Sequence, residues 1–115
     1  MGVDLTLMPL LQRGGNVSHE LLLLERRSEL WSEIEAIQRP FGRDVTCFLS
    51  RGEDGEPRYG DLGETPYGDP LTFVTAGELL TLQGHEAVKD NWRNRGIWML
   101  LSEMPADWPI VLYWH

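Results

Sequence analysis

Histidine and cysteine are the residues of this chain whose types suit acid–base, nucleophilic or metal chemistry. His19, His85 and His115 stand far apart in the sequence, and Glu20 and Glu86 directly follow two of them. Imidazoles and carboxylates together can hold zinc, but this spacing matches no metal-binding motif, and His85-Glu86 lacks the second histidine of a zincin helix. The sequence also has no phosphate-binding loop, nucleophile elbow or cysteine pair. We therefore predict no catalytic, metal or cofactor site, and we favour a protein that is not an enzyme.

An acidic stretch at residues 50–70 is the first candidate for an interaction surface. It is rich in Gly and Pro, which predicts a long loop, with a small hairpin near Asp54-Gly55. Residues 51–69 hold six acidic and two basic residues, so they carry −4 of the chain's net charge of −8. Tyrosines on a Gly-rich loop suit protein recognition, although they can also fold back onto the core while the carboxylates only solvate the loop. The candidate residues are Asp54, Tyr59, Asp61, Glu64, Tyr67 and Asp69.

A basic and aromatic cluster, Trp92-Arg93-Asn94-Arg95, is the second candidate. Arginines are slightly unfavourable at a helix N-terminus because of the helix dipole. We therefore expect Arg93 and Arg95 to have specific partners, either carboxylates of the acidic loop or an anionic ligand. Trp92 lies outside any apolar stripe, which favours a surface role.

Length, charge and cysteine content limit the class of protein. A chain of 115 residues should form a single domain, 1–115. The net charge of −8 argues against direct nucleic-acid or membrane binding and allows a partner with a basic surface. Cys47 lies in an apolar run, which predicts a buried free thiol and fits a cytoplasmic location. No apolar run approaches the length of a membrane helix.

The elements that must position these residues follow from hydrophobic periodicity. Strands or extended segments are predicted at 3–8, 17–24, 45–49, 71–74 and 110–114, and a loop at 12–16. The segment 17–24 is ambiguous between strand and helix because of its four leucines, and we favour a strand antiparallel to the first.

Three helices are predicted. The first covers 26–38 and ends at Pro40. The second covers 76–83, where Thr75 and Glu78 form a capping box and Val74 and Leu79 a hydrophobic staple. The third is capped by Asp90 or Asn91. Its predicted inner stripe is Ile97, Leu100, Leu101 and Met104, flanked by Trp98.

This order of elements predicts an α+β or α/β fold, with a single sheet of about four short strands packed against three helices. The first and last strands should lie near the middle of the sheet. In the last strand, Ile110, Leu112 and Trp114 share one face, and Val111 and Tyr113 share the other. Since both faces are apolar, both should be covered.

Three blocks of sequence resemble small uncharacterised proteins of phages, prophages and environmental bacteria. They are Met1-Gly-Val-Asp-Leu-Thr-Leu7; Ser18-His-Glu-Leu-Leu22 with Glu25-Arg-Arg-Ser-Glu-Leu-Trp31; and the tail from Tyr67, with Asn94-Arg-Gly-Ile-Trp98 and Pro109-Ile-Val-Leu-Tyr-Trp-His115. The resemblance implies a small cytoplasmic accessory protein and assigns no catalytic residue.

Three hypotheses follow for function. The first is a non-enzymatic, phage-type accessory protein that acts by protein–protein contacts through the acidic loop, including by mimicry of a nucleic acid. The second is a small enzyme or ligand-binding domain whose cleft is built from His19, His85, Arg93 and loop carboxylates. The third is a homo-oligomer that pairs through its last strand or its tryptophans.

Overall fold

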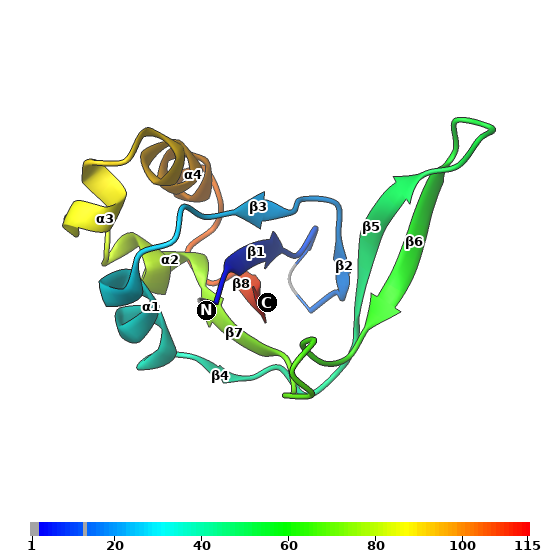
Figure 1. The fold of residues 1–115 in the computed structure, drawn as a ribbon, viewed down its shortest axis with the longest axis horizontal. Helices are drawn as coiled ribbons and strands as arrows, with labels where there is room; N and C mark the ends of the chain where they lie inside the picture. The colour runs from blue at the N-terminus through cyan, green and yellow to red at the C-terminus, as the bar shows by residue number, and fades with distance from the viewer. Residues whose placement is uncertain (1–2, 13) are drawn as a thin grey trace.

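The computed structural model describes residues 3–12 and 14–115, which form a mixed α+β fold with a five-stranded and a three-stranded sheet (Figure 1). Met1, Gly2 and Arg13 lie outside the described residues. The start of the Met1–Leu7 block and part of the predicted loop 12–16 therefore also lie outside them. In the five-stranded sheet all neighbouring strands are antiparallel. Its order is β3 (Leu22–Leu23), β1 (Leu5–Pro9), β8 (Pro109–Trp114), β7 (Thr72–Thr75) and β4 (Arg39–Pro40).

The smaller sheet holds β2 (Val17–Ser18), β5 (Val45–Arg51) and β6 (Pro57–Leu62) in that order. Strand β2 is parallel to β5, and β5 and β6 form an antiparallel hairpin. The helices of the described residues are α1 (Ser28–Glu35), α2 (Ala76–Leu80), α3 (Glu86–Lys89) and α4 (Trp92–Ser102). The prediction of a single sheet of about four strands with three helices was therefore wrong, although the predicted α+β class is confirmed.

Strand β8 lies at the centre of the larger sheet with β1 beside it, as predicted for the first and last strands. Leu5 is opposite Trp114 and Pro9 is opposite Ile110, so the two strands pair along their whole length. The other edge of β8 pairs with β7, where Val74 is opposite Ile110. Since both edges of β8 are occupied within the chain, its backbone offers no edge for pairing with a second copy.

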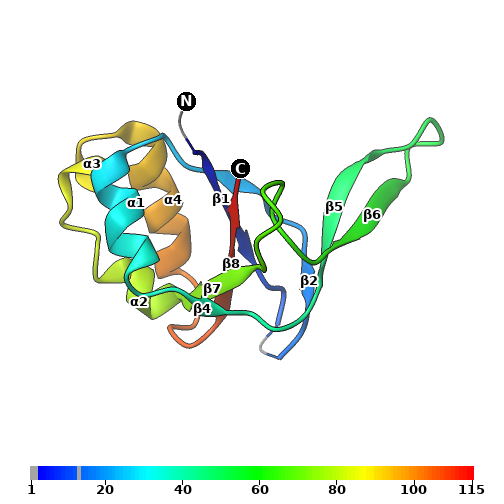
Figure 2. The ribbon, with the colours of Figure 1, turned by 60° about the horizontal axis from the view of Figure 1, so that its bottom comes forward.

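The two faces of β8 enter two separate cores. Ile110 and Leu112 are fully buried with Leu5, Leu7 and residues of the four helices. Val111 is buried on the opposite face with Met8, and with Val45 and Cys47 of β5. Figure 2 shows the helices on one side of the larger sheet and the β5–β6 hairpin on the other. The prediction that both faces are covered is confirmed.

Local sequence signals place the helix starts. The Thr75 side chain accepts from the Glu78 backbone N–H and the Glu78 side chain accepts from the Thr75 N–H, so the capping box is present. Asn91 caps α4. The first two helices are shorter than predicted and end at Glu35 and Leu80.

One prediction for the inner stripe of α4 was wrong. Leu100 is 45% exposed, whereas Asn94, Trp98 and Leu101 are buried. These three residues have the i, i+4, i+7 spacing of one helix face. The buried face of α4 is therefore centred on Trp98, and Leu100 is turned towards solvent.

The predicted strand 17–24 is divided between the two sheets. Val17 pairs with Thr46 in the smaller sheet, whereas Leu22 and Leu23 pair with β1 in the larger one. The chain therefore crosses from one sheet to the other through residues 19–21. Leu24 is buried and Leu23 is exposed, so the leucine run alternates as a strand.

The predicted loop 50–70 contains strand β6, whose extent the sequence analysis did not predict, although it placed a small hairpin near Asp54-Gly55. Most side chains of β6 are exposed, so it lacks the apolar alternation that marks a half-buried strand. The predicted turn near Asp54-Gly55 is confirmed as the tip of the β5–β6 hairpin. No helix in the described residues is long and apolar enough to cross a membrane.

Candidate functional site

The β5–β6 hairpin projects away from the helices and the larger sheet, and both views show its tip at the edge of the molecule (Figures 1 and 2). Gly55 N–H donates to the Gly52 carbonyl oxygen at 3.0 Å, and Gly52 N–H donates to the Glu56 carbonyl oxygen at 2.9 Å. Gly55 has φ +81°, a conformation that favours glycine. These bonds define the tip as an ordered turn rather than an irregular loop.

The hairpin's carboxylates are largely exposed to solvent. Asp54 accepts from the Glu56 N–H at 3.0 Å and lies 3.5 Å from the Arg58 guanidinium, so it has a local structural role. Asp61 accepts from the Thr46 hydroxyl at 2.6 Å. No ion pair within the described residues involves Glu53 or Glu56. The hairpin therefore presents more negative charge than its own arginines neutralise.

Tyr59 belongs to an aromatic cluster on the hairpin. Its ring contacts Phe48 and His19 edge-on, with centroid distances of 6.1 and 5.2 Å. Its hydroxyl lies 2.7 Å from His19 Nδ1. Tyr59 remains 39% exposed, so it neither enters the core nor stands free of the fold.

A second ordered turn carries the other predicted tyrosine and aspartate. Gly68 N–H donates to the Thr65 carbonyl oxygen at 2.9 Å, and Gly68 has φ +84°. The Thr65 hydroxyl accepts from the Tyr67 and Asp69 N–H groups, both at 3.3 Å. Glu64 and Pro70 form an isolated bridge that closes the segment. Thr65 is buried, so residues 64–70, called here the 64–70 turn, are anchored by it.

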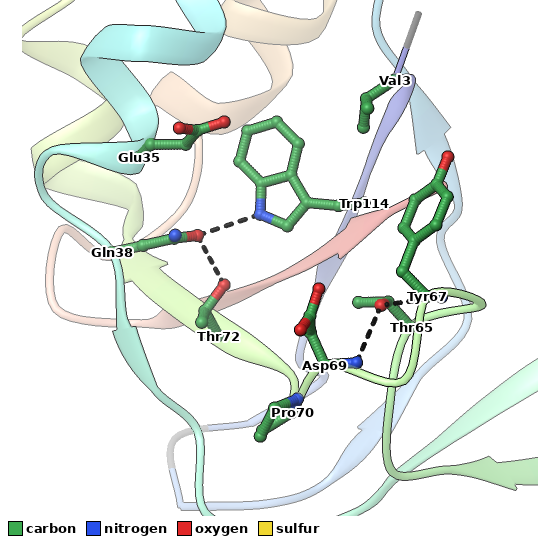
Figure 3. A pocket seen from close by; sticks show the side chains of 9 residues that line it. All are labelled: Val3, Glu35, Gln38, Thr65, Tyr67, Asp69, Pro70, Thr72 and Trp114. Carbon is green, nitrogen blue, oxygen red and sulfur yellow. Dashed lines mark hydrogen bonds between the residues drawn. The ribbon is translucent and has the colours of Figure 1, made fainter. Parts of the chain in front are cut away.

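The 64–70 turn forms one wall of a pocket of about 280 Å³ (Figure 3). Glu35 and Gln38 line it from the end of α1 and the residues after it, and Trp114 lines it from β8. Figure 3 shows the Asp69 carboxylate directed from the turn towards the Trp114 indole. The lining residues are Val3, Glu35, Gln38, Thr65, Tyr67, Asp69, Pro70, Thr72 and Trp114.

Hydrogen bonds fix one side of this pocket. Gln38 Oε1 accepts from Trp114 Nε1–H at 2.9 Å and from the Thr72 hydroxyl at 2.7 Å. The Trp114 indole also packs edge-on against Trp31, with a centroid distance of 5.9 Å. Trp114 was predicted on a covered face of the last strand, and it does pack against the helical core, but its half-buried ring also lines the pocket.

The pocket is negatively charged. Glu35 and Asp69 are its ionisable carboxylates, and none of its described lining residues is Lys, Arg or His. No ion pair in the described part of the chain involves either carboxylate. The arrangement therefore suits a cationic group that contacts an aromatic ring and a carboxylate together.

The basic and aromatic cluster lies elsewhere, on α4 among the helices and away from the hairpin in both views (Figures 1 and 2). Trp92 is 72% exposed, and the Arg93 guanidinium lies 5.7 Å from its ring centroid. Arg95 donates to the Lys89 carbonyl oxygen at 2.9 Å, where it satisfies the end of α3. Of the two kinds of partner considered for these arginines, the structure excludes the acidic loop, and the two candidate regions do not form one surface.

The cleft suggested for an enzyme is not assembled by the fold. His19 contacts Tyr59 on the hairpin, whereas the His85 Nδ1 caps α3 by accepting from the Ala87 N–H at 3.0 Å. Arg93 lies over Trp92. Within the described residues, no group of three or more His, Cys, Asp or Glu side chains is placed to hold a metal ion.

An apolar pocket of similar size lies between the two sheets. Leu21, Leu23, Leu49 and Leu62 line it, with Cys47 and Tyr113. Its polar groups include the Thr6 hydroxyl and His115 Nε2, which are 2.8 Å apart. Cys47 is buried as predicted, and burial raises the pKa of its thiol, with a smaller contribution from the Asp61 charge.

Sequence reasoning identified Tyr67 and Asp69 but missed Glu35, Gln38 and Trp114 as members of their pocket. Glu35 and Gln38 precede the 64–70 turn and Trp114 follows it, each by more than 25 positions, and only the tertiary fold brings them together. Comparison with protein-family models, curated proteins and solved structures found no match for the chain. The fold and the site thus define an α+β protein with a projecting acidic hairpin and an acidic, aromatic pocket beside it.

Proposed function

We propose that this protein is a non-enzymatic binding protein whose acidic surface, the β5–β6 hairpin with the 64–70 turn, contacts a partner with a basic surface. The observation that carries the proposal is the projecting hairpin, because its tip turn and most of β6 are exposed. The outer part of the hairpin, residues 49–59, buries little and carries unneutralised charge, so it adds little to folding, whereas Val45 and Cys47 at the base belong to the second core. A phage-type accessory role in the cytoplasm is part of this proposal and rests on the sequence resemblance alone.

The charge distribution supports electrostatic recognition. The segment 51–69 holds half of the chain's net negative charge, and complementary potentials accelerate encounter and exclude wrong partners more than they raise affinity. Tyr59 and Tyr67, 39% and 56% exposed, add apolar contact area beside the carboxylates. A basic partner surface would therefore find both charge and aromatic contacts here.

Affinity capture with matched charge variants tests this proposal. The surface variant is Asp54→Asn, Asp61→Asn, Glu64→Gln and Asp69→Asn, which keeps the hydrogen-bond acceptors of the two turns. The control removes the same charge from exposed positions on and near the helices: Glu29→Gln, Glu33→Gln, Asp90→Asn and Glu103→Gln. We expect the control to retain the wild-type partners and the surface variant to lose them. If both variants capture the same proteins as wild type, the proposal fails.

The apolar pocket between the sheets favours a second candidate function, a ligand-binding domain. Its leucine-rich lining and the Thr6–His115 pair are typical of sites for a small apolar molecule with one hydrogen-bonding group. Cyclohexanol is a suitable probe of this chemistry. Saturable shifts of the Leu21 and Leu49 methyl resonances would support the site, and unchanged spectra at high cyclohexanol concentration would exclude this class of ligand.

A further inference from the structure

The acidic, aromatic pocket of Figure 3 has a preformed aromatic wall. Trp114 Nε1–H is held by Gln38 Oε1 at 2.9 Å, and Trp31 packs edge-on against the indole at an interplanar angle of 80°. The ring is therefore fixed before any ligand binds, so little ordering of this side chain is needed on binding. Figure 3 shows the indole between Glu35 and Tyr67.

The charges of the pocket favour a cationic ligand. Asp69 is positioned by the hydrogen bond from its own N–H to the Thr65 hydroxyl, and Glu35 lies at the last position of α1. A carboxylate at the C-terminal end of a helix is unfavourable by the helix dipole, so a bound cation would relieve the local potential. The described lining residues supply no cation, and the two carboxylates have no ion-pair partner among the residues that the structure describes.

The shapes of the groups favour a guanidinium over an ammonium. A guanidinium is planar, stacks on aromatic rings and presents several N–H donors in one plane, whereas an ammonium is a strongly hydrated point charge. Glu35 and Asp69 line the same pocket as the Trp114 ring and come from separate segments, so the pocket combines the two kinds of group that a guanidinium recognises. The volume of about 280 Å³ is small, which fits a side chain better than a folded element.

We infer that this pocket binds the guanidinium group of an arginine side chain presented by a partner protein. The charge complementarity of the site identifies this occupant. The guanidinium contacts the Trp114 ring and donates hydrogen bonds to Asp69 and Glu35. The inference rests on the proposed function for the partner's identity as a protein, but the pocket's preference for a guanidinium can be measured without that partner.

An NMR titration with N-acetyl-arginine amide tests the pocket directly, with N-acetyl-citrulline amide as the neutral analogue of the same shape. We expect saturable shifts of the Trp114 indole N–H and the Tyr67 amide with the arginine compound, with weak, millimolar affinity because the carboxylates are exposed. The citrulline compound should cause no saturable shift. N-acetyl-lysine amide should bind more weakly than the arginine compound.

Single substitutions test which carboxylates bind the cation. Asp69→Asn and Glu35→Gln should each weaken binding of the arginine compound about 3-fold, as expected for exposed ion pairs. Glu33→Gln, which removes a charge from α1 outside the pocket, should leave it unchanged. Equal shifts with arginine and citrulline, or equal affinity for wild type and the Asp69→Asn and Glu35→Gln variants, would overturn the inference. A capture variant limited to the hairpin, Asp54→Asn with Asp61→Asn, can fail independently of this titration, since Asp54 and Asp61 lie outside the pocket.

Discussion

Replacement of Asn94 by Ala should remove a buried polar connection between α4 and two other segments of the helical layer. Asn94 is fully buried, and its side chain makes three hydrogen bonds. It accepts from the Glu25 N–H at 2.7 Å, and it donates to the carbonyl oxygens of Glu25 at 3.2 Å and Ala87 at 2.8 Å. At about 1 kcal/mol net for each bond, the substitution costs about 3 kcal/mol.

Alanine's higher helix propensity offsets only about 0.5 kcal/mol of this loss. The Asn94→Ala protein should therefore unfold about 10 °C below wild type, measured by circular dichroism. Asn91→Ala, which removes only the cap of α4, should cost about 1 kcal/mol. Asn94→Asp should be at least as damaging as Asn94→Ala at pH 7, because its carboxylate would face two carbonyl oxygens. An Asn94→Ala variant within about 0.5 kcal/mol of wild type would refute this reasoning.

Three further outcomes are expected. Arg39 holds Glu78 through two hydrogen bonds of 2.7 and 2.8 Å and lowers the pKa of Glu78 from 4.5 to about 2. The resulting stability is present above pH 4.5 and is lost as the pH falls from 4.5 towards 2. Both side chains are partly exposed, so Glu78→Gln should cost only about 1 kcal/mol at pH 7, measured by urea unfolding. The difference in unfolding free energy from wild type should shrink below pH 4.5, and a constant difference would contradict this reasoning. Cys47 is buried with a raised thiol pKa, so it should react with a thiol reagent at pH 8 far more slowly in the native protein than in denaturant; equal rates would contradict the described core. Gly68→Ala should destabilise the protein by about 1 kcal/mol because of the positive φ, and it should broaden the Tyr67 and Asp69 amide signals, whereas unchanged spectra would mean that the 64–70 turn does not depend on glycine.

The sequence predicted well the features that depend on the residues of a single segment. The capping box at Thr75 and Glu78 needs only residues three apart, and the placement of β8 follows from its apolar residues on both faces. The division of residues 17–24 between two sheets was not predictable, because it depends on pairing with β5, more than 20 residues away.

The candidate site was predicted only in part, because it too depends on contacts between distant segments. Tyr67 and Asp69 were identifiable because they lie in an acidic, Gly-rich segment. Glu35 and Trp114 become pocket residues only because α1 and β8 are brought beside the 64–70 turn by the larger sheet. The extent of strand β6 was not predicted because an exposed edge strand carries no hydrophobic period.

Site-specific photocrosslinking tests the central claim, that the acidic surface contacts a partner protein, most directly. A benzoylphenylalanine at Glu56 would stand on the hairpin, and one at Glu33 would stand on α1 as the control; both positions are exposed. The proposed function predicts crosslinks to a partner from Glu56 and none from Glu33, with the crosslinked peptides rich in Lys and Arg. Crosslinks from Glu33 alone would contradict it.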